Sequence, residues 1–98
     1  MTRAEFDASM SVDQPSEDCS LPLAALWWDA KGEWAKAHDL VDELETREGM
    51  LVHAYLHRKG GDTSNAEYWY RHAGRLFSQL SLEAEWEGLV GELIEGQT

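Results

Sequence analysis

The sequence predicts a small all-α domain of five helices. Three observations support this prediction. Apolar residues recur at helical spacing from residue 20 onward, serine and glycine residues stand where helices would begin and end, and no stretch alternates long enough for a strand. The chain has 98 residues, enough for one hydrophobic core. We therefore expect a single all-α domain over residues 20–98, preceded by an acidic tail over residues 1–19.

The tail differs from the rest of the chain in composition. Its acidic residues face one basic residue, Arg3, and serine, glutamine and proline interrupt any apolar period. Such a segment buries too little apolar area to offset its ordering entropy. We expect residues 1–19 to be disordered.

Three helices are expected in the first half of the domain. Ser20 is a suitable N-cap for the first, which has Pro22 in its first turn and ends before Gly32. The second helix begins near Trp34 and ends between residues 46 and 49. The third spans about residues 48–59 and ends at the glycine pair 60–61.

Two more helices are expected in the second half. Ser64 precedes Glu67 by three residues, the spacing of a capping box, and Asp62 and Thr63 are alternative caps. Apolar residues continue the helical period to Leu80. Ser81 begins a fifth helix, which has one apolar stripe and ends near Gly96. Because its other faces are rich in glutamate, this helix suits the end of a stack, where one face is buried and the other meets water.

A short pattern occurs twice, at the same offset of 29 residues. In each copy a small residue lies seven positions before a glycine and an alanine lies five positions after it: Ala25, Gly32 and Ala37, then Ala54, Gly61 and Ala66. Small residues allow two antiparallel helices to approach, and the glycine lets the chain turn between them.

This pattern resembles the tetratricopeptide and Sel1-like helical-hairpin repeats over about residues 21–77. Residues 65–73 look most like the second helix of a Sel1-like unit. The resemblance implies two antiparallel hairpins of shortened period, with the fifth helix as a C-terminal cap, and a role in protein–protein interaction. A plain five-helix bundle remains the alternative. Residues 52–74 are also similar to small bacterial proteins of unassigned function, which imply no activity.

Composition argues against several function classes. Lysine and arginine number 8 against 19 acidic residues, a net charge of −11, which disfavours nucleic acid and anionic membranes as partners. No apolar run approaches the length of a membrane span. The single cysteine, Cys19, excludes an intrachain disulfide. With no secretory signal recognised, we expect a cytoplasmic protein.

Histidines are the first candidates for chemistry. His53 and His57 are four residues apart on a predicted helix and therefore share a face, as two ligands of one metal ion would. His72 or His38 is the candidate third ligand. The simpler interpretation is that these histidines line a helix interface and bind tyrosine, aspartate or backbone, so no metal or other cofactor is expected.

A basic patch is the second candidate. Arg58, Lys59, Arg71 and Arg75, with aromatic neighbours, make residues 49–80 locally positive. Such charges can also be a solvated helix face paired with nearby acids. The predicted binding residues are His53, Tyr55, His57, Arg58, Trp69, Arg71, His72 and Arg75. A further hypothesis is that the acidic tail folds over this patch.

The sequence therefore predicts a protein-interaction module that binds an acidic or amphipathic segment of a partner. Self-association into a homodimer stays open, because two and a half repeat units leave apolar edges uncovered. The alternative is a metal- or histidine-dependent small-ligand binding protein or enzyme centred on His53, His57 and His72. An enzyme is the less favoured of these interpretations, and no catalytic residue is assigned.

Overall fold

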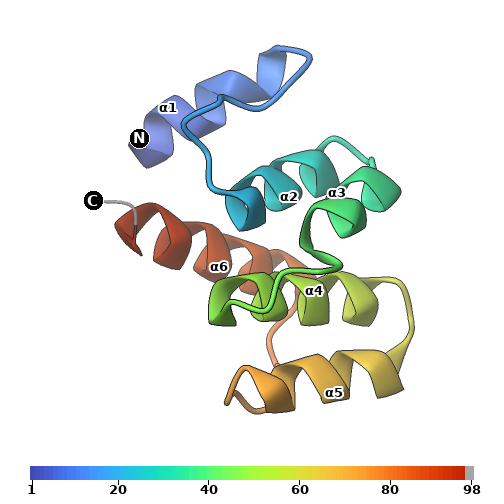
Figure 1. The fold of residues 1–98 in the computed structure, drawn as a ribbon. Coiled ribbons are helices and arrows are strands. Elements are labelled where there is room, and N and C mark those ends of the chain that lie inside the picture. Colours follow the sequence, from blue (N-terminus) through green and yellow to red (C-terminus); the bar gives the residue numbers. More distant parts are fainter. Residues whose placement is uncertain (97–98) are drawn as a thin grey trace.

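The computed structural model describes residues 1–96, and this part of the chain is all-α, as predicted (Figure 1). It contains six α-helices rather than five, so the predicted number was wrong. The helices are α1 (Arg3–Ala8), α2 (Leu21–Ala30), α3 (Trp34–Val41), α4 (Arg47–Lys59), α5 (Thr63–His72) and α6 (Leu82–Gly96), with a short 3-10 turn at Ser9–Ser11.

The additional helix, α1, lies in the segment for which the sequence predicted disorder. Thr2 and Glu5 form a capping box at its start, in which each side chain accepts a hydrogen bond from the other residue's backbone N–H. Phe6 is fully buried, with its ring centroid 6.2 Å from that of Trp86 on α6. The structure differs from the expectation because one buried aromatic side chain anchors an otherwise polar segment.

Polar contacts also tie this segment to the body of the molecule. Arg3 forms an ion pair with Glu87 on α6, and Lys31 donates hydrogen bonds to the backbone carbonyls of Met10 and Val12. These contacts hold the segment against α2 and α6. The acidic tail was hypothesised to fold over the basic patch on α4 and α5. In the structure it lies on the other side of the molecule, away from α5 (Figure 1).

The two repeated glycines adopt the same backbone geometry. Gly32 has φ +82° and Gly61 has φ +85°, a region that residues with a Cβ atom rarely adopt. In each case the next residue's N–H bonds back to the carbonyl five positions earlier, from Glu33 to Trp28 and from Asp62 to His57, both at 2.9 Å. This hydrogen bond terminates the preceding helix, and the next helix begins a few residues later.

The helix starts and ends agree with the sequence in part. Ser20 caps α2 as expected, and its hydroxyl accepts a bond from the N–H of Leu23. For α5 the cap is Asp62 rather than Ser64. The same helix was expected to reach Leu80 but ends at His72, because Gly74 adopts φ +74° there.

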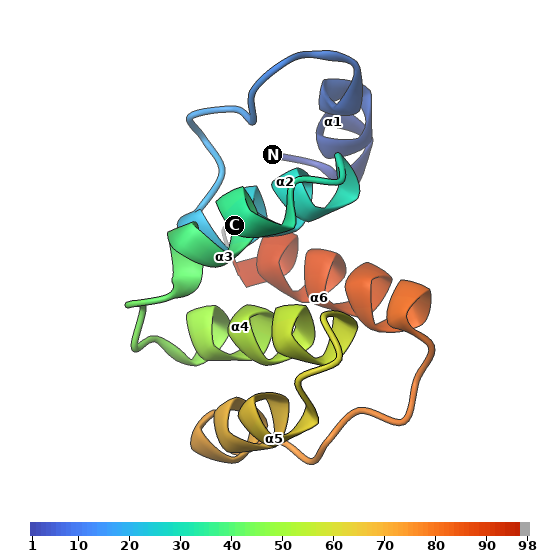
Figure 2. The same cartoon turned by 90° about the vertical axis from the view of Figure 1, so that its right-hand side faces the viewer.

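The packing of the helices forms one core. α2 packs against α3 and α4 against α5, while α6 lies across α2 and α4 (Figures 1 and 2). Completely buried side chains from several helices, including Trp27, Val52 and Val90, meet at the centre. Within residues 1–96, no helix is both long enough and apolar enough to cross a membrane.

Candidate functional site

The eight predicted binding residues do not form one surface. They divide into three groups: members of two buried polar networks, members of a histidine cluster, and residues exposed on or near α5. Each group has a different chemical environment.

Arg58 belongs to the first network. Its Nη1 donates to Glu85 Oε1 at 2.7 Å, and its Nη2 donates to the carbonyl of Leu80. Glu85 is only 6% exposed and also accepts a hydrogen bond from the Tyr70 hydroxyl. Burial, followed by this bond to Glu85, raises the pKa of Tyr70. We call Arg58, Tyr70 and Glu85 the Glu85 network, and in it Arg58 already has its counter-charge.

Tyr55 belongs to the second network. Its hydroxyl donates to Asp29 Oδ2 at 3.0 Å, and Lys59 Nζ lies 3.0 Å from Asp29 Oδ1. Asp29 is 4% exposed. Burial raises the pKa of Tyr55, and the charge of Asp29 raises it further. Tyr55 is 2% exposed, and its hydroxyl has its hydrogen-bond partner within the chain.

The remaining predicted residues lie at the surface and do not assemble into a basic patch. Arg75 forms an ion pair with Glu92 on α6 at 3.0 Å. Arg71 and His72 are exposed, and His72 Nδ1 donates to the Tyr68 carbonyl at 2.9 Å. The predicted positive surface is thus divided by ion pairs with acids of α6.

The histidine cluster consists of His38 on α3 and of His53 and His57 on α4. One ring nitrogen from each of the three lies within 4.8 Å of the others. His38 Nε2 and His53 Nε2 are 3.0 Å apart, a hydrogen bond in which one ring donates and the other accepts. His38 is therefore the third member of the cluster, and His72 is not.

Two tryptophans fix the orientation of these rings. Trp34 on α3 stacks on His38, with centroids 5.0 Å apart and planes 11° apart, and Trp69 on α5 stacks on His53 at 4.4 Å and 23°. The Trp34 indole N–H donates to the Leu56 carbonyl at 2.8 Å. Three helices therefore hold the cluster in place.

Two rings of the cluster, those of His53 and His57, have lowered pKa values. Burial and, to a smaller extent, the nearby His57 and His38 together lower the pKa of His53 to about 4, while Asp42 opposes the shift. Burial, followed by His38, also lowers the pKa of His57. Both rings thus keep the neutral form that binds metal ions, in which a nitrogen lone pair is available.

One nitrogen of the cluster has no partner. His53 is 2% exposed, and within residues 1–96 its Nδ1 is the buried side-chain nitrogen or oxygen for which no hydrogen bond is found. A buried polar atom without a partner is destabilising. It also means that no bond at Nδ1 fixes the tautomer of His53, so Nε2 can present either a proton or a lone pair.

Asp42 stands beside the cluster. Its Oδ1 lies 3.8 Å from His38 Nε2 and 3.9 Å from His53 Nε2. Neither Asp42 nor the stacking role of Trp34 was predicted from the sequence. The signal was present, since Asp42 follows His38 by four residues, the same spacing that identified His53 and His57.

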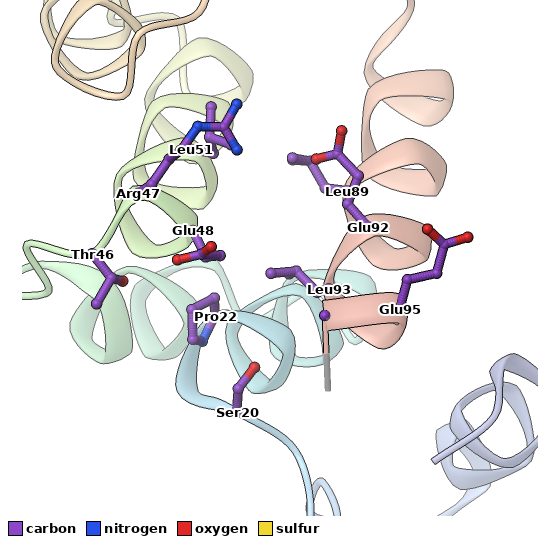
Figure 3. A pocket seen from close by; sticks show the side chains of 11 residues that line it. Ser20, Pro22, Thr46, Arg47, Glu48, Leu51, Leu89, Glu92, Leu93 and Glu95 are labelled. Atoms are coloured by element: carbon purple, nitrogen blue, oxygen red, sulfur yellow. The ribbon is translucent and has the colours of Figure 1, made fainter. Parts of the chain in front are cut away.

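A separate groove opens where the first turns of α2 and α4 meet the C-terminal half of α6 (Figure 3). Its volume is about 630 Å³. Leu51, Leu89 and Leu93 form an apolar floor, and Arg47 and Glu48 lie among its polar residues. None of the eight predicted binding residues lines this groove, which we call the end groove.

Comparison of the chain with models of protein families, with curated proteins and with solved structures gave no match.

Proposed function

We propose that this protein binds a divalent transition-metal ion, with zinc as the reference ion, through His38, His53 and His57. The observation that supports the proposal is the convergence of three ring nitrogens within 4.8 Å, from two helices and between two tryptophan rings. Imidazole is a preferred ligand of zinc, copper and nickel. Three histidines at this separation can reach a single ion.

The contacts within the cluster favour a cation between the rings. His38 and His53 share one N–H hydrogen between their Nε2 atoms, so both nitrogens already point toward the same position between the rings. A metal ion can replace this proton, provided both Nε2 atoms present lone pairs. The unpartnered Nδ1 of His53 permits the required tautomer, and the two tryptophans keep the rings from turning away.

The proposal is tested with protein purified without a histidine tag. We expect one zinc per chain, retained through dialysis, and a rise in thermal stability. An ion that binds only the folded state adds about 2.7 kcal/mol when its free concentration is 100 times Kd. His57→Gln should abolish both effects. His72→Gln is the matched control, because His72 lies outside the cluster, and it should behave like the wild type.

Two outcomes would overturn the proposal. One is wild-type protein that binds no zinc, copper, nickel or cobalt and shows no thermal shift. The other is zinc binding that His72→Gln removes and His57→Gln leaves intact, because the ion would then lie elsewhere.

The scaffold in this proposal is the helical-hairpin repeat that the sequence suggested. The complete burial of Ala37 and Ala66, each five residues after a glycine of positive φ, supports two equivalent units at an offset of 29 residues. The cluster lies where the two units meet, because α3 belongs to the first and α4 to the second.

A second candidate function is the interaction module, and the observation that favours it is the end groove. Its apolar floor fits one face of an amphipathic helix (Figure 3). The net charge of −11 favours a partner with basic residues on the other face. An acidic partner is less suited, since Arg58, Lys59 and Arg75 form ion pairs within the chain.

This candidate is tested by NMR titration with two synthetic amphipathic helices, one of leucine and lysine and one of leucine and glutamate. We expect the lysine peptide to shift the amide signals of residues 46–51 and 89–96. The glutamate peptide, the matched control, should leave them in place. Equal binding of both peptides, or shifts elsewhere only, would contradict an interaction site in the end groove.

A further inference from the structure

We infer that Asp42 is the fourth ligand of the metal site, so that the ion is held in a closed, four-coordinate centre that joins α3 to α4. This inference rests on the proposed function, because it requires an ion at the histidine cluster. It extends the proposed site from three ligands to four. With four protein ligands the ion would stabilise the packing of α3 against α4 and would not be catalytic.

The four side chains form two pairs that face each other. His38 lies on α3, and Asp42, four residues later, is the C-cap of that helix. His53 and His57 lie four residues apart on α4. Residues at this spacing project from the same side of a helix. Because α3 packs against α4, two donors from each helix can meet at one point between them.

Three of the four ligand atoms lie close to the spacing of a tetrahedral ion. Zinc bound to nitrogen and oxygen at about 2.0–2.2 Å in a tetrahedral site separates its ligand atoms by about 3.4 Å. The Nε2 atoms of His38 and His53 are 3.0 Å apart, and Asp42 Oδ1 is 3.8 Å and 3.9 Å from them. Shifts of a few tenths of an ångström would give these three atoms the tetrahedral spacing. The ring of His57, whose nitrogen lies within 4.8 Å of the other two histidine nitrogens, would have to move further.

Asp42 can make such a shift at little cost. Its side chain is 55% exposed, so a rotation breaks no core packing. Its backbone N–H donates to the carbonyl of His38 at 2.9 Å. That bond continues the helical geometry to Asp42 and keeps the two side chains on one face.

The carboxylate also provides what the three imidazoles lack. Three neutral histidines leave the full charge of a divalent ion uncompensated in a partly buried site, and one carboxylate halves it. With four protein ligands no coordination position remains for water, which is how structural zinc sites differ from catalytic ones. The ion would therefore fix α3 against α4.

The test compares Asp42→Asn with Asp39→Asn. Both variants remove one exposed carboxylate from the region of α3, but only Asp42 lies near the cluster. Zinc affinity is measured by competition with a chromophoric chelator. The coordination number is read from the visible absorption of the cobalt-loaded protein, which is more intense for four-coordinate than for six-coordinate cobalt.

We expect Asp42→Asn to weaken zinc binding at least about tenfold and to reduce the cobalt absorption. Asp39→Asn should match the wild type in both measurements. Asp42→His, which restores a donor at the same position, should recover the intense cobalt spectrum. Recovery by a donor distinguishes a ligand from a residue that only supports the helix.

The inference and the proposed function fail in different ways. If the wild type binds zinc and Asp42→Asn binds it within about twofold, with an unchanged cobalt spectrum, Asp42 is not a ligand and only the inference is overturned. If the wild type binds no metal ion, the proposed function is overturned and the inference with it.

Discussion

The Glu85 network and the histidine cluster are both polar groups that join α4 to neighbouring helices, yet they are constructed in opposite ways. In the Glu85 network a carboxylate meets a guanidinium and a tyrosine hydroxyl, so charge and hydrogen bonds are balanced. In the histidine cluster three rings without a strong counter-charge lie close together, and His53 Nδ1 has no partner.

The difference separates the parts of the molecule that hold the fold from the part suited to bind something. A satisfied network stabilises one arrangement, and removing one member leaves the others unpaired. An unsatisfied buried nitrogen is a cost of folding, and clusters of perturbed titratable groups gather at functional sites. The comparison predicts that changes in the two regions have different consequences, which three experiments can test.

The largest effect is expected from Glu85→Ala. This change leaves Arg58 with an unpaired charge in a partly buried position and deprives the Tyr70 hydroxyl of its acceptor. Breaking a buried ion pair in this way lowers the free energy of unfolding by roughly 3–5 kcal/mol. Urea denaturation followed by circular dichroism measures the change.

Glu83→Ala is the control for this experiment, because Glu83 is exposed on the same helix. It should change the free energy of unfolding by less than about 0.5 kcal/mol. A loss below about 1 kcal/mol for Glu85→Ala would show that the Glu85 network does not stabilise the fold, and the contrast with the cluster would disappear.

The next effect is a loss of stability in acid that originates in the cluster. The pKa of His53 is about 4 in the folded protein and near 6.5 in the unfolded chain. The unfolded chain therefore takes up a proton at His53 more readily than the folded protein does. Its contribution to stability is therefore complete above pH 6.5 and is lost as the pH falls toward 4. The loss is about 3 kcal/mol for a shift of this size.

The groups facing His53 are His38 and Asp42 from α3, His57 from its own helix and Trp69 from α5. The measurement is urea denaturation between pH 7 and pH 4.5 with a chelator present. His53→Phe removes the titrating group, so its stability should depend less on pH over this range. Identical pH profiles for the two proteins would contradict a buried neutral His53.

The sequence predicted the helices well where local signals determine them. Ser20, Gly32 and Gly61 mark helix ends through their own hydrogen bonds and backbone angles, which do not depend on distant residues. The burial of Phe6 does depend on distant residues, because its pocket includes Trp86, 80 positions away. Composition alone therefore assigned α1 to disorder.

The candidate site was predicted in part for the same reason. His53 and His57 could be paired from their spacing on one helix, but the choice between His38 and His72 depended on which helix packs against that face. The basic patch was predicted without the ion pair of Arg58, because its partner, Glu85, lies 27 residues further along the chain. Charge counted along a segment does not reveal partners that folding brings from elsewhere.

The smallest effect on stability is expected from His53→Phe at pH 7 in chelator. Phenylalanine can keep the stacking on Trp69, and it removes a buried nitrogen that has no hydrogen bond. The one bond lost is that to His38, whose side chain is 19% exposed and can bond to water instead. The free energy of unfolding should therefore change by less than about 1 kcal/mol, while zinc binding is lost. If this variant lost as much stability as Glu85→Ala, the histidine cluster would be a structural network of the same kind, and its geometry would no longer favour a bound ion.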